Sequence, residues 1–289
     1  MTTATRHRKR RPWLRRLSLA IALSAAALAA FLASRTPSFD RDWADDVARL
    51  SDAVAADDGT VLITNIRNWD YDADGPVSKR WESGTFDPRR LRAVWFNLDP
   101  FPAWDGVAHT FLVFEFAEGT PSRFLGVSVE ARKQRGETYS GLKGLFRQYE
   151  LLYVWAAESD LIKRRAVYLD ENVYQYRLEL TPEQMALVFD AFVARTRELT
   201  RAPRFYNTLL SNCTNELAAT IRGNGGRLPW HYSYYLTGHA DRLLHRLGYI
   251  PPPDDDFPRI RAAALKTPKV LANRGLSGDA FSRAIRRLR

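Results

Sequence analysis

The order of apolar and polar residues predicts a mixed domain of strands and helices behind one long apolar segment. Residues 17–33 are apolar except for Ser18 and Ser24. Runs rich in β-branched and aromatic residues predict strands at 60–69, 91–98, 107–116, 123–132, 148–156 and 172–180. Helical spacing of apolar residues predicts helices at 181–200, 213–223 and 237–247. We therefore expect an α+β fold, with helices packed on an antiparallel sheet and an N-terminal transmembrane helix.

The apolar segment follows a block of positive charge, since residues 1–16 contain seven Arg and Lys and no acidic residue. The segment is long for a signal-peptide core and a little short of the roughly 20 residues that span a bilayer comfortably. An Ala-x-Ala cleavage signal at residues 27–29 leaves a cleaved signal peptide as the alternative to the uncleaved anchor that we favour. Because a positive block stays in the cytoplasm, we expect residues from about 35 onward outside the bacterial inner membrane, in the periplasm or outside the cell.

Four parts follow from these patterns. Residues 1–35 form the cytoplasmic basic segment and the membrane anchor or signal, and residues 36–59 a linker with a short amphipathic helix. Residues 60–250 form the extracytoplasmic domain, with polar loops at 70–87 and 136–144. The charged stretch at 158–165 is either a solvated face or the lining of a cleft. Residues 251–289, which begin with a run of three prolines and three aspartates, form a basic C-terminal tail.

The net charge of +10 resides in the two ends of the chain. Residues 1–16 contribute +7 and residues 257–289 contribute +8, which leaves −5 for the middle. A mildly acidic body is not the footprint of a nucleic-acid-binding protein, so we expect no nucleic-acid partner. The basic tail could lie on anionic lipid at the membrane surface, or it is simply solvated.

The only cysteine, Cys213, stands where a helix is predicted to begin. Asn212 is a favourable N-cap, Leu217 and Ile221 share the face of the cysteine, and residues 224–226 end the helix. The helix N-terminus favours a thiolate, whereas the plain alternative is a small buried apolar side chain. In an exported protein, one cysteine has no internal partner, so it is either free and reactive or joined to another chain.

A predicted hairpin brings a histidine opposite a carboxylate. Strands 107–116 and 123–132 are joined by a short turn, so they pair antiparallel. With the turn near residues 119–120, His109 falls opposite Glu130, and Ser128 shares the face of Glu130. A carboxylate can hold the tautomer of a histidine, although a surface cross-strand pair would give the same pattern. A slip of one residue would move Glu130 to the other face.

The sequence indicates neither a metal nor a cofactor. Zinc sites usually combine several cysteines or include two histidines spaced as His-x₃-His. This sequence has one cysteine and no His-x₃-His pair. It also has no phosphate-binding glycine loop and no internal repeat.

Several short motifs occur one after another along the chain. They are Asn65-x-Arg67-Asn68, Ala108-His109-Thr110-Phe111, Ser128-Val129-Glu130-x-Arg132, Tyr149-Glu150-x-x-Tyr153-Val154, Glu158-x-Asp160, Arg164-Arg165 and Phe205-Tyr206-Asn207 followed by Asn212-Cys213-Thr214. In this order they resemble the Lnb N-terminal periplasmic domain, a bacterial family, over about residues 60–225.

The resemblance implies a circularly permuted papain-like fold, akin to the NlpC-type peptidases and their permuted relatives. In those relatives a strand histidine comes first, a polar partner lies on the next strand, and the cysteine follows at a helix start. His109, then Ser128 or Glu130, then Cys213 follow a similar order. The resemblance therefore implies a Cys–His thiol enzyme. It leaves the substrate open, because the relatives include peptidases, amidases and lipid acyltransferases.

The mechanism that follows is acyl transfer through a thioester, to water or to another acceptor, on an amide or ester of an envelope component. Cys213 is the expected nucleophile, as a thiolate stabilised by the helix N-terminus and by protonated His109. His109 takes and returns the proton, and Glu130 orients it, with Ser128 as the fallback. Candidates for the oxyanion site are Asn212 and Tyr206, with the backbone N–H of Cys213. Candidates for shaping the cleft, or for buried hydrogen bonds instead, are Arg67, Asn68, Arg132 and Glu158.

Two other functions remain open on the sequence. A non-catalytic, membrane-tethered module could bind an envelope component in the same cleft, and it would tolerate a buried, unreactive Cys213. A partner-linking thiol would need a fully exposed Cys213, which the apolar face of Leu217 and Ile221 argues against.

Overall fold

The computed structural model describes residues 12–102, 105–117, 123–223, 229–251 and 256–287. The chain divides into two units, Met1–Pro37 and Ser38–Arg289. The first unit contains α1 (Pro12–Ser34), in which Trp13–Ser34 is long and apolar enough to cross a membrane. The predicted N-terminal transmembrane helix is therefore present as a candidate span.

The second unit is built on a mostly antiparallel sheet of eight strands in the order β1-β2-β7-β6-β5-β4-β8, with β3 paired to β2. Among the strands that the structure describes, only the β2–β7 neighbours run parallel. The strands are β1 (Asp52–Ala55), β2 (Val61–Tyr71), β3 (Pro76–Phe86), β4 (Leu91–Pro100), β5 (Ala108–Phe116), β6 (Arg123–Arg132), β7 (Glu150–Ala157) and β8 (Tyr174–Arg177). This sheet with its packed helices confirms the predicted α+β fold.

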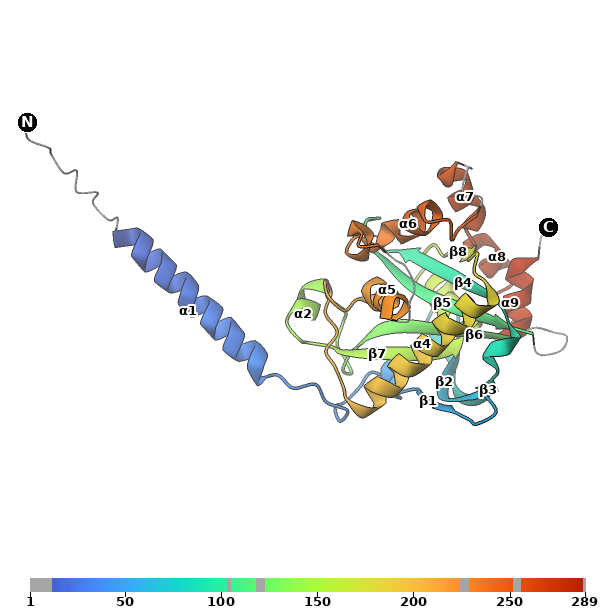
Figure 1. Cartoon of the computed structure of the whole chain (residues 1–289), viewed down its shortest axis with the longest axis horizontal. Coiled ribbons are helices and arrows are strands. Elements are labelled where there is room, and N and C mark those ends of the chain that lie inside the picture. Colours follow the sequence, from blue (N-terminus) through green and yellow to red (C-terminus); the bar gives the residue numbers. More distant parts are fainter. Residues whose placement is uncertain (1–11, 103–104, 118–122, 224–228, 252–255, 288–289) are drawn as a thin grey trace, which may run out of the picture. The chain divides into compact units, whose positions relative to one another are not determined.

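Helices cover both faces of the sheet. The α-helices of this unit are α2 (Gly141–Leu145), α3 (Glu158–Lys163), α4 (Pro182–Arg201), α5 (Cys213–Gly223), α6 (Ala240–Arg246), α7 (Phe257–Ala264), α8 (Thr267–Ala272) and α9 (Gly278–Arg286). Short 3₁₀ helices occur at Asp45–Val47, Pro88–Arg90, Tyr232–Tyr234 and Thr237–His239, and a π-helix at Arg164–Tyr168. In Figure 1, α4 and α5 lie over the face of the sheet that is turned to the viewer.

The alternation of side chains along β5 separates two apolar cores. Ala108, Leu112 and Phe114 pack in the core that α4 and α5 cover, and Cys213 belongs to this same core. Phe111 and Val113 pack instead in the core that contains residues of α3 and α9. Each residue of β5 is thereby assigned to one face, and His109 shares the face of Phe111.

The start of α4 confirms the predicted capping box. The backbone N–H of Gln184 donates to the Thr181 hydroxyl at 3.3 Å, and the Thr181 N–H donates to the Gln184 side chain at 2.9 Å. Pro182 occupies the first helical position, where a missing N–H costs no hydrogen bond.

Thr181→Ala should lower the free energy of unfolding by about 1 kcal/mol, because the first turn of α4 loses its side-chain cap. Urea unfolding followed by circular dichroism measures the loss. Thr138→Ala is the matched control, since Thr138 is an exposed loop residue, and it should leave the midpoint unchanged. Equal midpoints for the two variants would contradict a contribution from the cap.

Two segments before β4 differ from their predicted structure. Residues 70–87 were expected to form a loop, but β3 pairs with β2 over most of this stretch. The polar pattern misled because β3 is largely solvent-exposed, so few of its positions need an apolar residue. In place of the short helix expected within 36–59, the chain forms a 3₁₀ turn at Asp45–Val47 and then β1.

The C-terminal residues pack against the sheet unit and do not form the expected basic tail. Helices α7, α8 and α9 occupy 257–286, and Phe281 and Ile285 of α9 are fully buried. The apolar residues recur at helical spacing between the arginines, so one side of α9 packs into the core, and Arg286 pairs with the buried Glu158. The charged stretch at 158–165 likewise lies in α3 and the start of the π-helix, where Glu158, Asp160 and Lys163 are buried.

Candidate functional site

Strands β5 and β6 separate at the end of the hairpin that carries His109. Their pairing ends at Phe111 and Ser128. The Val107 carbonyl accepts from Phe101, just beyond β4. Backbone groups alternate in direction along an antiparallel strand, so Ala108 and its second neighbour Thr110 direct theirs toward β6. Beyond the last pair they face an opening between the two strands, which we call the β5–β6 gap.

Side chains from distant parts of the chain fill the β5–β6 gap. The Thr237 hydroxyl lies 2.7 Å from the backbone nitrogen of Ala108 and donates to its carbonyl at 2.6 Å. The Cys213 sulfur lies 3.9 Å from the same carbonyl. Thr214, the residue after Cys213 in α5, places its hydroxyl 3.0 Å from the hydroxyl of Thr110 on β5. The thiol is thus held against the backbone of the residues that flank His109.

The helix that carries the thiol begins as predicted. Asn212 Oδ1 accepts from the backbone N–H of Asn215 at 2.8 Å, as an N-cap should. The amide nitrogen of Asn212 donates to the carbonyls of Thr208 and Tyr234 at 2.9 and 3.1 Å. The amide group of Asn212 therefore orders the start of α5 and the two loops beside it. The predicted helix stop at 224–226 lies outside the described residues.

His109 is held from one side by a short relay. Its Nε2 lies 2.7 Å from the Ser128 hydroxyl, which donates to Glu130 Oε1 at 2.7 Å. Because the serine proton goes to the carboxylate, Nε2 must carry the proton that serine accepts, and Nδ1 is left with a free lone pair. Continuing the observed register places His109 opposite Glu130, as the hairpin predicts.

The side chains of His109 and Cys213 lie on opposite faces of β5 and are not hydrogen-bonded to each other. The imidazole leaves β5 on the face of Phe111, with ring centroids 6.0 Å apart, whereas α5 packs on the opposite face. The hydrogen-bond contacts of the thiol are the Ala108 carbonyl and the Thr214 hydroxyl. Both side chains are 7% exposed. The thiol and the imidazole are therefore both buried, on the two faces of β5.

A buried arginine, Arg165 of the π-helix, joins three carboxylates around the relay. Its guanidinium lies 3.2 Å from Asp99, 3.3 Å from Glu130 and 4.0 Å from Glu171. Asp99 is the cross-strand partner of His109 on β4. The Arg165 guanidinium therefore contacts carboxylates on both strands that flank the histidine, β4 and β6. The sequence motifs include Arg165, but sequence reasoning did not assign it to the site. Arg165 belongs to the site because this charged stretch is buried, which a local sequence pattern does not show.

Burial favours the neutral forms of both the thiol and the imidazole. It raises the pKa of Cys213, against the opposing effect of the Thr110 backbone and hydroxyl. Burial, together with the positive charge of Arg165, lowers the pKa of His109 to about 3. For Glu130, burial opposes ionisation, but His109 and Arg165 outweigh it and lower the pKa. The resting state is therefore a neutral thiol beside a neutral imidazole, which differs from the expected thiolate and imidazolium.

Asp99 should make the protein less stable as the pH rises through the neutral range. Burial raises the pKa of Asp99 to about 8 in the folded protein, whereas an unfolded aspartate titrates near 3.9. Between these values the folded state holds the proton that the unfolded state has lost, so stability falls with increasing pH. Asp99→Asn should flatten the decrease in melting temperature between pH 5 and pH 8. Asp74→Asn, on an exposed loop, is the control; identical pH profiles for all three proteins would contradict the raised pKa.

The other predicted site residues lie either near the thiol or in ion pairs and hydrogen bonds elsewhere in the fold. Tyr206 is beside the thiol: its hydroxyl is 3.2 Å from that of Tyr139, and burial and the neighbouring Cys213 raise its pKa. Arg67 pairs with buried Asp160 at 2.7 Å. Asn68 bonds to Glu82 on the exposed side of β2.

Arg132 and Glu158 also have structural partners. Arg132 donates to the carbonyls of residues 47 and 48 at 2.9 and 2.6 Å. Glu158 forms a two-point pair with Arg286 of α9, with both distances 2.7 Å. The structure therefore joins His109, Ser128 and Glu130 by hydrogen bonds and places Tyr206 near Cys213. Arg132, Glu158, Arg67 and Asn68 hold other parts of the fold. Among the described residues, no group of three or more His, Cys, Asp or Glu side chains could hold a metal ion.

Comparison with known proteins agrees with the motifs. The family model for the Lnb N-terminal periplasmic domain matches residues 78–237, which is more than half of the chain. No curated protein and no solved structure shows significant similarity to the chain.

Proposed function

The chain belongs to the Lnb N-terminal periplasmic domain family, and we propose that it is a thiol hydrolase or acyltransferase that acts on an amide or ester of an envelope component. The family and the apolar helix α1 indicate a membrane-anchored protein with a periplasmic domain. We place the anchor in the bacterial inner membrane, because the basic residues before α1 would remain in the cytoplasm. The alternatives differ in the acceptor, which is water for a hydrolase and an amine or hydroxyl for a transferase.

One observation carries this proposal: the Cys213 thiol lies against the Ala108 carbonyl in the β5–β6 gap, and the next residue, His109, is hydrogen-bonded to Ser128. The relay through Ser128 and Glu130 holds the proton on Nε2 of His109. Nδ1, the nitrogen nearer the backbone, is then the free base. A surface cross-strand pair of His109 and Glu130 would not require a serine that links the histidine to the carboxylate. Catalytic hydrogen bonds are often long in the free enzyme and tighten when substrate binds.

The first half of the reaction forms a thioester. His109 Nδ1 takes the proton of the Cys213 thiol as the sulfur attacks the acyl carbonyl, because a neutral pair reacts by general-base catalysis. The tetrahedral oxyanion is stabilised by backbone N–H groups at the start of α5, with the Tyr206 hydroxyl as the side-chain candidate. The imidazolium then gives its proton to the leaving amine or alcohol, and the acyl group remains on sulfur.

The second half restores the thiol. Water, an amine or a hydroxyl attacks the thioester carbonyl while His109 Nδ1 takes its proton. The sulfur leaves and recovers that proton from the imidazolium. Glu130, which Arg165 and Ser128 both contact, stabilises the positive charge that the imidazole carries in each half.

A chain with one cysteine permits a direct test. The full chain is mixed with p-nitrophenyl acetate, and acetyl transfer is followed by mass spectrometry with hydroxylamine to cleave thioesters. We expect an acetyl group on Cys213 that hydroxylamine removes, no such group on Cys213→Ala, and unchanged transfer for His231→Ala, a histidine in a loop outside the gap. If wild type acquires no thioester, or acquires it no faster than a simple thiol in solution, the enzyme proposal fails.

A specific observation favours a second function, a non-catalytic module that binds an envelope component. The thiol is buried, its pKa is raised by burial, and its contacts are a carbonyl and a threonine hydroxyl. Such a thiol is typical of packing. This function predicts that Cys213→Ala, which fails to form the thioester, retains any envelope binding of the wild type.

A further inference from the structure

An exposed apolar surface lies at the end of the domain where the chain enters from α1. It consists of α2 and the loop before α5, and its exposed apolar residues are Leu142, Phe146, Leu209 and Leu210. Leu142 and Leu210 are 67% and 74% exposed. The two segments are joined, because the Thr208 hydroxyl donates to the Gly141 carbonyl at 2.6 Å. We call these four residues and the backbone that joins them the α2–loop surface.

The chain between α1 and the domain is very short. Helix α1 ends at Ser34 and the second unit begins at Ser38. Four residue steps extend no more than about 14 Å. If α1 spans the bilayer, Ser38 must remain within that distance of the end of the span, whatever the angle between helix and domain.

Within the domain, Ser38 is fixed beside the α2–loop surface. Its backbone N–H donates to Glu150 at 3.3 Å, and Arg41 pairs with the same carboxylate at 2.9 Å. The preceding residue, Tyr149, accepts from the Tyr206 N–H through its carbonyl and from the Ser140 N–H through its hydroxyl. These bonds connect the entry point to both segments of the surface. The short tether therefore starts beside the beginning of β7, which also anchors both segments that carry the exposed leucines.

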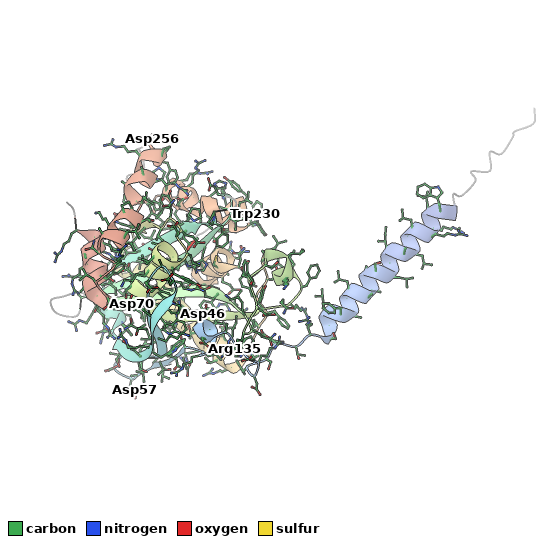
Figure 2. The ribbon with its side chains drawn as sticks, turned by 180° about the vertical axis from the view of Figure 1, so that it is seen from behind. Asp46, Asp57, Asp70, Arg135, Trp230 and Asp256 are labelled. Carbon is green, nitrogen blue, oxygen red and sulfur yellow. The ribbon has the colours of Figure 1, made fainter. Side chains whose placement is uncertain are left out.

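The charge of this surface also suits a bilayer. Residues 138–149 and 201–215 contain four Arg and Lys and no acidic residue, although the middle of the chain is acidic as a whole. Lys143 and Arg147 are exposed and alternate with the apolar residues of α2. Apolar side chains with a basic fringe are typical of surfaces that insert into the headgroup region of anionic membranes. Trp230, 72% exposed, lies at the edge of the domain in Figure 2, and α2 lies at an edge in Figure 1.

We infer that the α2–loop surface inserts into the outer leaflet of the membrane that holds α1, with anionic lipid headgroups around its basic residues. The loop leads directly into Asn212 and Cys213, so this contact would hold the β5–β6 gap at the membrane surface. The inference does not depend on the chemistry of the thiol.

The depth of a nitroxide label tests this contact. The full chain carrying Cys213→Ser is labelled at Leu210→Cys and reconstituted in vesicles of phosphatidylethanolamine and phosphatidylglycerol. Electron paramagnetic resonance then compares access of oxygen, which concentrates in lipid, with access of a water-soluble nickel chelate. We expect the label about 5–10 Å below the lipid phosphates. Val77→Cys, at a 62% exposed valine on β3, is the matched control and should report water.

Two other outcomes overturn the inference. A Leu210 label that is open to the nickel chelate lies in water. A label shielded from both reagents is covered by protein, which would indicate a second copy of the chain. As a further check on the basic fringe, Lys143→Glu combined with Arg147→Glu should move the Leu210 label toward water and leave the Val77 label unchanged. Each labelled protein must first show the melting temperature of the unlabelled chain.

Discussion

His109→Ala is expected to lower the rate of Cys213 acylation by about 10²–10⁴-fold, which is the usual contribution of a general base. The thiol of the variant would still lie in the β5–β6 gap, but no base would remain to take its proton. Stopped-flow release of p-nitrophenol from p-nitrophenyl acetate measures the rate. Since burial raises the pKa of Cys213, the variant should recover activity only at alkaline pH, where the thiol ionises by itself.

The pH profile separates this mechanism from an ion-pair mechanism. With the pKa of His109 near 3, the imidazole of the wild type is already neutral above about pH 4, so the acylation rate should be flat from pH 5 to pH 8. A thiolate–imidazolium pair would instead react with a midpoint set by thiol ionisation below pH 7. Ser128→Ala should reduce the rate less than His109→Ala, because the histidine remains while its tautomer is no longer fixed. Equal rates in wild type and His109→Ala would remove the histidine from the mechanism.

Asp160→Ala is expected to lower the free energy of unfolding by about 3–5 kcal/mol, the usual loss when one partner of a buried ion pair is removed. Asp160 is fully buried, accepts two hydrogen bonds from Arg67 within 3.0 Å, and also accepts from the Trp69 N–H at 2.8 Å. Without the carboxylate, the guanidinium of Arg67 remains buried and unneutralised between β2 and α3. Urea unfolding followed by tryptophan fluorescence measures the loss.

An exposed ion pair provides the control. Lys79 and Asp45 are 2.8 Å apart but nearly half exposed, and such pairs contribute little. Lys79→Ala should leave the unfolding midpoint unchanged, and Asp160→Asn should fall between the two variants because it retains one acceptor oxygen but neither the second acceptor nor the charge. If Asp160→Ala unfolds at the midpoint of Lys79→Ala, the pair is not a major contribution to stability. Asp70 of β2 forms a further ion pair between these elements, with the buried Lys163 of α3, and is labelled in Figure 2.

The sequence by itself determined the elements whose local pattern is strong. The β5–β6 hairpin follows from β-branched runs around a short turn, and its register follows from the length of that turn, so the position of His109 opposite Glu130 could be predicted. The capping residues Thr181 and Asn212 fix the starts of α4 and α5, because a cap is a contact between residues three positions apart. The family could also be recognised, since its motifs are short and local.

Only the tertiary structure decided which of these residues meet. That β5 and β6 separate beyond Phe111 and Ser128 depends on Thr237 and Cys213, which compete for the backbone of Ala108 from more than one hundred residues away. Arg165 belongs to the site because the stretch around it is buried, and burial of charge is not visible in a local pattern. The protonation states also depend on tertiary structure: a pKa depends on the surroundings that packing creates, and packing here favours neutral Cys213 and neutral His109.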